Sequence, residues 1–240
     1  MQEKISYEEI RKLRIEQYGT EFKDWIWVLV KQYKDRTHFL FELLQNAEDE
    51  GATDVKIVLY KDRLEIEHNG HLFTKADVNS ITKVAKSTKN SESGKKIGKF
   101  GIGFKSVYAY TATPKIYSGD YAFEIHDFIN PYEIETVPLS SPDLTRMVLP
   151  FDNGEIAPEK AFLEIERAIR EQLTATTLLF LDAITDIDIA IGGTGEGYHI
   201  HRKSSPRADG FGAVSNTTLT NLREASGDFI SLGAFRISGR

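Results

Sequence analysis

Hydrophobic residues recur with two different periods along this chain, and the periods separate predicted helices from predicted strands. Apolar positions spaced by three or four residues predict helices at 6–17, 23–33, 39–50 and 159–173. Strict or near alternation predicts strands at 54–60, 63–68, 113–117, 121–126, 146–151, 184–191, 198–203 and 229–237. Shorter helices are expected at 74–84 and 100–110. The chain therefore combines helices and strands, as in an α+β protein.

Residues with capping chemistry set the expected ends of two helices. Thr37 is placed to cap the helix at 39–50, and Gly51 is placed to end it. Thr74 and Asp77 have the spacing of a capping box, which predicts a short helix running through Val84.

The predicted helix at 39–50 has two unlike faces. Its apolar stripe consists of Leu40, Leu43, Leu44 and Ala47. Glu42, Asn46 and Asp49 stand at i, i+4 and i+7 and form a polar stripe opposite. Such a stripe is usually a solvated face, and it becomes a ligand site only if a second element supplies a partner.

A candidate partner follows a polar segment further along the chain. Residues 85–99, AKSTKNSESGKKIGK, lack periodicity and predict a mobile loop. Gly101 and Gly103 then open a predicted helix, where free backbone N–H groups and glycines would admit a phosphate. A GxG pair alone also marks ordinary tight turns.

Together the two stretches suggest phosphate chemistry. Mg²⁺ prefers oxygen ligands and keeps most of its waters, so the carboxamide of Asn46 would be a sufficient protein ligand. A carboxylate one turn earlier, at Glu42, could orient and deprotonate a water that attacks the terminal phosphate.

Composition limits the function classes. The 240 residues carry a net charge of −6 and a pI near 5.6, so the chain as a whole is not a basic nucleic-acid-binding domain. Cysteine is absent, which excludes disulfides, thiolate metal sites and a cysteine nucleophile. With no apolar run of membrane-spanning length and a charged N-terminus, a soluble, cytoplasmic protein without membrane contact is expected.

Several motifs in order resemble one ATPase superfamily. ELLQNAED, the NG turn followed by FTKAD, the polar loop and IGKFGIGFKSVYA resemble the GHKL (Bergerat-fold) ATPases over about residues 37–151, and most closely the chaperone-like and sacsin-type ATP-binding domains. The resemblance implies a two-layer α/β sandwich, with a mixed, mostly antiparallel sheet covered by helices on one face. It also implies ATP and Mg²⁺ as cofactors.

Site residues follow from that resemblance position by position. Glu42 matches the general base, Asn46 the magnesium ligand, Asp49 a supporting polar residue, Lys86 the entry lysine of the lid and Thr145 the threonine beneath the adenine. The full expected nucleotide-binding set is Asn46, Asp49, His68, Asn69, Gly70, Phe73, Lys86, Ser87, Gly98, Lys99, Phe100, Gly101, Ile102, Gly103, Phe104 and Thr145.

The chain departs from the family at the adenine-reading DxGxG motif. His68 stands in the aspartate position and Leu72 in that of the second glycine. Either a neutral imidazole of His68 reads the base, or Asn69 makes the contact, or nucleotide selectivity is relaxed. If His68 reads the base with its reference pKa of about 6.5, ATP binding should weaken below neutral pH.

The predicted function is Mg²⁺-dependent ATP binding with slow hydrolysis, in which closure of the lid drives dimerisation or rearrangement of a larger chaperone-like multidomain protein. The alternatives are an ATP-gated DNA clamp of the MutL or MORC kind and a module that binds nucleotide without turnover. Predicted partners are ATP or ADP, a second copy through the N-terminal and lid regions, and further domains of a longer parent chain; nucleic acid is possible but not indicated. We expect an ATP-binding domain at 1–173 and a C-terminal α/β extension at 174–240.

A pair of histidines near the C-terminus is left without a role. His199 and His201 alternate on a predicted strand and point the same way, which is compatible with metal binding. The sequence around them indicates no third ligand, so no metal site is assigned there.

Overall fold

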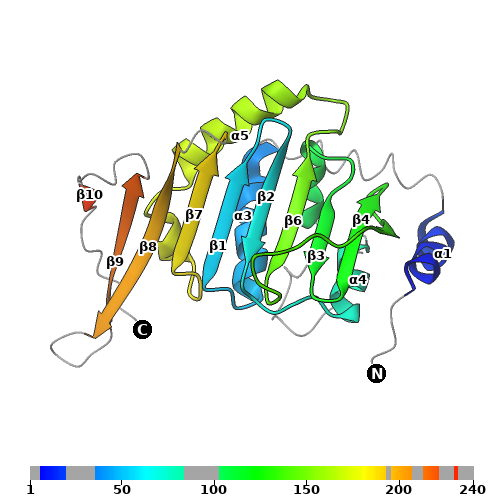
Figure 1. Ribbon diagram of the computed structural model, residues 1–240, viewed down its shortest axis with the longest axis horizontal. Helices are drawn as coiled ribbons and strands as arrows, with labels where there is room; N and C mark the ends of the chain where they lie inside the picture. The colour runs from blue at the N-terminus through cyan, green and yellow to red at the C-terminus, as the bar shows by residue number, and fades with distance from the viewer. Residues whose placement is uncertain are drawn as a thin grey trace, which may run out of the picture.

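The protein is built on one long mixed sheet (Figure 1). The computed structural model describes residues 6–19, 36–83, 103–192, 196–206, 213–221 and 230–231. Within these residues ten strands are joined in the order β10-β9-β8-β7-β1-β2-β6-β3-β4-β5. Only β1 and β7 pair in parallel, and the other neighbours are antiparallel. The α+β class and the mixed, mostly antiparallel sheet are therefore confirmed.

The strands follow the predicted alternation with small shifts at their ends. They are β1 (Asp54–Leu59), β2 (Arg63–His68), β3 (Lys115–Ser118), β4 (Tyr121–His126), β5 (Asn130–Glu133), β6 (Thr145–Pro150), β7 (Asp186–Ile191), β8 (Glu196–Pro206), β9 (Ala213–Asn221) and β10 (Ile230–Ser231). Strands β5 and β9 were not predicted. Most of the strand expected at 229–237 lies outside the described residues.

The helices confirm several predictions and correct others. They are α1 (Tyr7–Tyr18), α3 (Phe39–Asp49), α4 (Lys75–Ile81) and α5 (Pro158–Gln172), with 3-10 helices η1 (Arg36–His38), η2 (Phe104–Ala109) and η3 (Thr177–Phe180). Figure 1 shows α3, α4 and α5 on one face of the sheet, while α1 packs beside β5. The helix predicted at 23–33 lies outside the described residues.

Three local predictions need correction. Thr37 does not cap α3, because His38 is the N-cap residue and Thr37 lies inside η1, where its hydroxyl accepts a hydrogen bond from Gln172. The capping box at Thr74 is present, but α4 ends at Ile81 and not at residue 84. The helix predicted at 100–110 is a six-residue 3-10 turn within the described residues, so α-helical N-terminal geometry is not what this segment offers.

The apolar stripe of α3 anchors the core, as its spacing predicts. Its leucines and alanine are at most 2% exposed and belong to one cluster with the inward residues of β1 and β2. Burying each such leucine contributes roughly 1.5–3 kcal/mol. Because α3 is fixed in this way, its polar residues have defined positions.

A single carboxylate joins α3 to the second half of the chain. Glu48 accepts hydrogen bonds from the backbone N–H groups of Asp182, Ala183 and Ile184, at 2.6, 2.6 and 2.9 Å. Strand β7 follows and pairs with β1, so the sheet is continuous across the predicted boundary at 173/174. That boundary stays a prediction. Among the described residues, no helix is long and apolar enough to cross a membrane.

Candidate functional site

Gly103, the residue that precedes η2, meets α3 at Glu42. Gly103 lies directly against the Glu42 side chain, since a β-carbon added there would collide with Oε2 and lie 2.8 Å from Cδ. On its other side Oε1 of Glu42 is 3.1 Å from Nε2 of His38, one helical turn earlier. With 28% of its side chain exposed, Glu42 is accessible to solvent yet held from two sides. The structure thus brings together two residues 61 positions apart that the sequence grouped in one site.

Asn46 is buried one turn further along α3. It is 4% exposed, and its Nδ2 has no hydrogen-bond partner among the described residues. An unpaired buried amide costs on the order of 1–3 kcal/mol, so it needs a compensating reason. Asn46 therefore has hydrogen-bonding capacity that the described residues do not use.

Asp49 does not share this environment. It is exposed and accepts a hydrogen bond from Gln45 at 3.1 Å on the outer side of α3. The polar stripe is therefore split, because Asn46 points inward and Asp49 points to solvent. The contacts of Asp49 do not connect it with Glu42.

A second group of predicted residues meets on the same side of the sheet, where β2, β6 and β3 lie side by side. Thr145 is the cross-strand neighbour of both His68 and Ser118. Oγ of Ser118 is 2.6 Å from Oγ1 of Thr145 and accepts a hydrogen bond from the backbone N–H of Phe73 at 2.8 Å. All four side chains are at most 6% exposed.

The imidazole of His68 is held neutral. It is 4% exposed, and its Nδ1 accepts a hydrogen bond from the backbone N–H of Gly70 at 3.2 Å, which leaves the ring proton on Nε2. Burial lowers the pKa of His68 from 6.5 to about 4. This corrects the expectation of a charge change near pH 6.5, since protonation is displaced toward pH 4.

The neighbouring turn has a structural function. Oδ1 of Asn69 accepts from the backbone N–H groups of Thr53 and Asp54, and its Nδ2 donates to both side chains. Gly70 lies against the end of α3, where a β-carbon would be 2.9 Å from the carbonyl oxygen of Glu50. With its amide engaged four times, Asn69 is poorly placed to replace the usual adenine-reading aspartate, and His68 is the better candidate.

Most of η2 is buried, including Phe104 and Lys105. Phe104 is 1% exposed, so only its backbone could contribute to a ligand site. Lys105 follows it and donates from Nζ to the carbonyl oxygens of Ile81 and Phe128, at 2.7 and 2.5 Å. Burial, with Arg14 nearby, lowers the pKa of Lys105 to about 7. This lysine fixes η2 to α4 and is not directed at the candidate site.

The remaining predicted residues lie outside the described part of the chain. These are Lys86, Ser87, Gly98, Lys99, Phe100, Gly101 and Ile102. A cavity of about 410 Å³ lies between η1 and α5 and is lined in part by Thr37, Tyr110, Glu164 and Gln172. None of the predicted site residues lines it, and we do not assign the nucleotide to it.

Sequence reasoning missed two side chains of the candidate site. Ser118 joins Thr145 to Phe73 only through strand register, which local sequence does not reveal. His38 was identifiable, because it precedes Glu42 by four residues and that spacing places both on one side of a helix.

Comparison with known proteins points to one family. Residues 20–136 match the Sacsin domain. Sacsin of Homo sapiens is 35% identical over 114 residues, which cover 40% of this chain and 2% of sacsin. Protein NO VEIN of Arabidopsis thaliana is 34% identical over 97 residues, which cover 38% of this chain and 4% of that protein. Over residues 20–136 this chain is therefore similar to the Sacsin domain, and it corresponds to only a small fraction of either relative.

Proposed function

We propose that this chain is an ATP-binding and slowly ATP-hydrolysing module of the Bergerat type. The observation that carries the proposal is the contact between Glu42 of α3 and Gly103 at the start of η2, with the unpaired amide of Asn46 one turn away. An acid on α3 contacts a glycine at the start of η2, and an unpaired amide lies one helical turn further along α3. That combination suits a magnesium-bound triphosphate.

The donor set fits Mg²⁺ and a phosphate chain. The carboxamide of Asn46 is buried and not fully used by the protein, so its oxygen could ligate Mg²⁺ while its Nδ2 donates to a phosphate oxygen. Gly103 lets the backbone approach the Glu42 carboxylate closely, and any side chain at this position would force that carboxylate to move. When bound, Mg²⁺ would neutralise charge on the phosphates.

Glu42 is the proposed general base. Its carboxylate is partly exposed, so a water can reach it, and His38 restricts its orientation from the other side. A carboxylate here favours transfer of the phosphoryl group to water, whereas histidine kinases of this fold typically have asparagine. Because chaperone-like members take a phosphate-contacting cation from outside the domain, we expect turnover by this chain alone to be slow.

The base end of the nucleotide would lie over His68 and Thr145. The neutral imidazole has its proton on Nε2, and the Ser118–Thr145 pair adds hydroxyls beside it. His68 would therefore present a donor, where the carboxylate usual in this family presents an acceptor. We infer that nucleotide selectivity differs from that of relatives with aspartate at this position.

The wider role is proposed by similarity to the sacsin-like group. ATP would order residues 85–99 as a lid and favour dimerisation or rearrangement of a larger chaperone-like protein. A shift of population of this kind requires ATP to bind the closed arrangement more tightly than the open one.

Glu42→Gln is the direct test of hydrolysis. The variant should bind ATP in the presence of Mg²⁺ with nearly unchanged affinity, while phosphate release falls at least about 100-fold, because the isosteric amide cannot accept the proton. Calorimetric titration measures the first quantity and a phosphate-release assay the second. Glu65→Gln, on the opposite face of the sheet and paired with Arg63, should change neither.

Asn46→Ala separates binding from chemistry. Loss of Mg²⁺-dependent ATP binding in this variant would support the site, whereas unchanged binding would place the nucleotide elsewhere. Equal phosphate release by the wild type and Glu42→Gln would exclude the hydrolytic role and leave a module that only binds nucleotide.

A further inference from the structure

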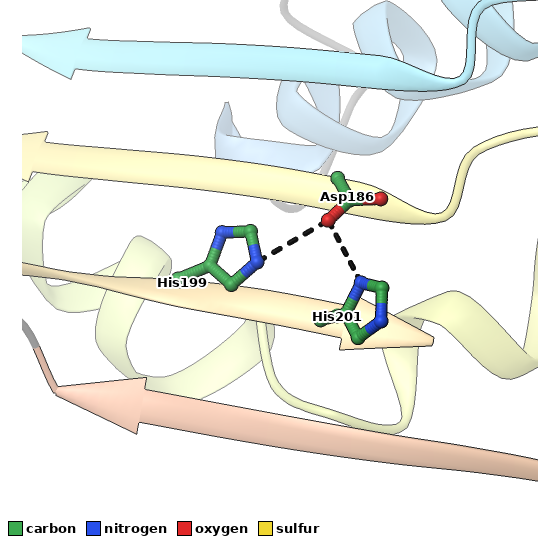
Figure 2. Close-up of side chains that lie close together, drawn as sticks. All are labelled: Asp186, His199 and His201. Carbon is green, nitrogen blue, oxygen red and sulfur yellow. Dashed lines mark hydrogen bonds and ion pairs between the residues drawn. The ribbon is translucent and has the colours of Figure 1, made fainter. Parts of the chain in front are cut away.

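Strands β7 and β8 place four titratable residues on the face of the sheet opposite α3 and α5. On the core-facing side of these strands, Ile187, Ile189 and Ile200 are at most 1% exposed. Because side chains alternate along a strand, the residues between them point the other way. These are Asp186, Asp188, His199 and His201, as Figure 2 shows for three of them.

The antiparallel register brings these residues together. Asp186 faces His201 directly, and Asp188 faces His199. Oδ1 of Asp186 lies 2.8 Å from Nδ1 of His201 and 3.2 Å from Nε2 of His199 (Figure 2). The two imidazole rings are stacked, with centroids 5.9 Å apart and an interplanar angle of 15°. One carboxylate oxygen thus contacts a ring nitrogen of each histidine.

His199 is held by carboxylates at both nitrogens. Its Nδ1 lies 2.7 Å from Oδ1 of Asp188, in addition to the contact of Nε2 with Asp186. A neutral imidazole has only one N–H, so donation to Asp188 directs the Nε2 lone pair at the Asp186 oxygen. Two lone pairs at this distance repel each other unless a cation, either a second proton or a metal ion, lies between them.

We propose that Asp186, His199 and His201 form a zinc-binding site. Each of the three residues offers one ligand atom within 4.8 Å of the others, and the proposed ligands are Oδ1 of Asp186, Nε2 of His199 and Nδ1 of His201. Tetrahedral zinc with bonds of about 2.0–2.1 Å separates its ligand atoms by roughly 3.3 Å. The ligand pairs at 2.8 and 3.2 Å need to open by only a few tenths of an ångström.

The surroundings supply the other features of such a site. Asp188 accepts the remaining N–H of His199, which is the usual outer-sphere carboxylate of a metal-bound imidazole. The ligand side chains are 26–41% exposed, so an ion can enter and a fourth position stays open to water. The site lies outside residues 20–136 and on the face away from Glu42, so it does not depend on the proposed ATPase activity.

A zinc titration of the full, untagged chain against a chromophoric chelator tests the proposal. We expect one ion per chain. His199→Gln and His201→Gln should each lower the zinc affinity at least about 100-fold, and Asp188→Asn about 10-fold through loss of the outer partner. Zinc at a hundred times its Kd should raise the unfolding midpoint of the wild type by about 5–10 °C.

His126→Gln is the matched control. His126 is as exposed as His201, at 41%, and pairs with one carboxylate, Glu124, at 2.7 Å, so it offers two ligands only. Its replacement should leave the zinc affinity unchanged. Co²⁺ added to the wild type should give the intense visible absorption of tetrahedral coordination, a measurement that requires no variant.

Two results would overturn the proposal. One is zinc affinity that His199→Gln and His201→Gln lower no more than His126→Gln does. The other is a wild-type Co²⁺ spectrum that stays that of the hydrated ion, which would identify the cluster as cross-strand ion pairs alone.

Discussion

Burial gives His68 chemistry that its residue type alone does not predict. An exposed histidine would change charge near pH 6.5, but this ring is enclosed and already accepts a hydrogen bond from Gly70. Protonation of Nδ1 would break the hydrogen bond from Gly70, and the resulting charge would be buried away from water. As a donor at the proposed base site, the ring would therefore keep its protonation state throughout the neutral range.

The lowered pKa of His68 predicts how stability depends on pH. Its folded pKa of about 4 lies below the unfolded value of 6.5, so its stabilising contribution is complete above about pH 6.5 and is lost as pH falls toward 4. This contribution of His68 to the free energy of unfolding is about 3 kcal/mol. Urea unfolding at several pH values should show that the free energy of unfolding falls more steeply with decreasing pH for the wild type than for His68→Gln. The exposed His71→Gln should follow the wild-type curve; a wild-type slope equal to that of His68→Gln would contradict the buried neutral ring.

The connection between α3 and β7 depends on Glu48. One carboxylate engages three consecutive backbone N–H groups, which would otherwise need other partners at a tight bend before the strand. Glu48→Ala should lower the free energy of unfolding by about 2–3 kcal/mol, measured by chemical denaturation. Asp49→Ala removes the adjacent, exposed carboxylate and should change the free energy of unfolding by less than about 0.5 kcal/mol. Equal effects of the two substitutions would show that the bend does not need this anchor.

Periodicity predicted those elements whose two faces differ. The apolar stripe of α3, the β1–β2 pair and α5 were evident because one face is buried and the other polar. Strand β5 is a four-residue edge strand, too short for a pattern, and η2 differs from an α-helix only in backbone geometry. Local sequence predicts such features poorly.

The proposed nucleotide site and the proposed zinc site differ in how much of each could be predicted from the sequence alone. Glu42, Asn46 and Gly103 were predicted because their segments resemble a known family, although Asp49 turned out to face solvent. Asp186 could not be recognised as a partner of His199 and His201, since its position depends on the pairing of β7 with β8. Long-range register supplies this information, and residue spacing does not.

At the scale of the whole molecule, β7 is a central strand between β1 and β8. A chain ending at residue 173 would leave β1 with unpaired backbone groups and would expose the apolar residues that β7 covers. We expect it to lose the cooperative thermal transition in calorimetry. A chain ending at residue 192 retains β7 and should keep that transition. A cooperative, native-like transition in the shorter chain would show that residues 1–173 fold independently.

The parallel pairing of β1 with β7 also bears on the order of events during synthesis. The two partners are separated by about 130 residues, so β1 leaves the ribosome long before its second neighbour exists. Until then one side of the β1–β2 hairpin stays open to other strands, including those of neighbouring nascent chains. Completion of the sheet is therefore expected to be a late and slow step, and the interval before it is when the polypeptide most needs protection from aggregation.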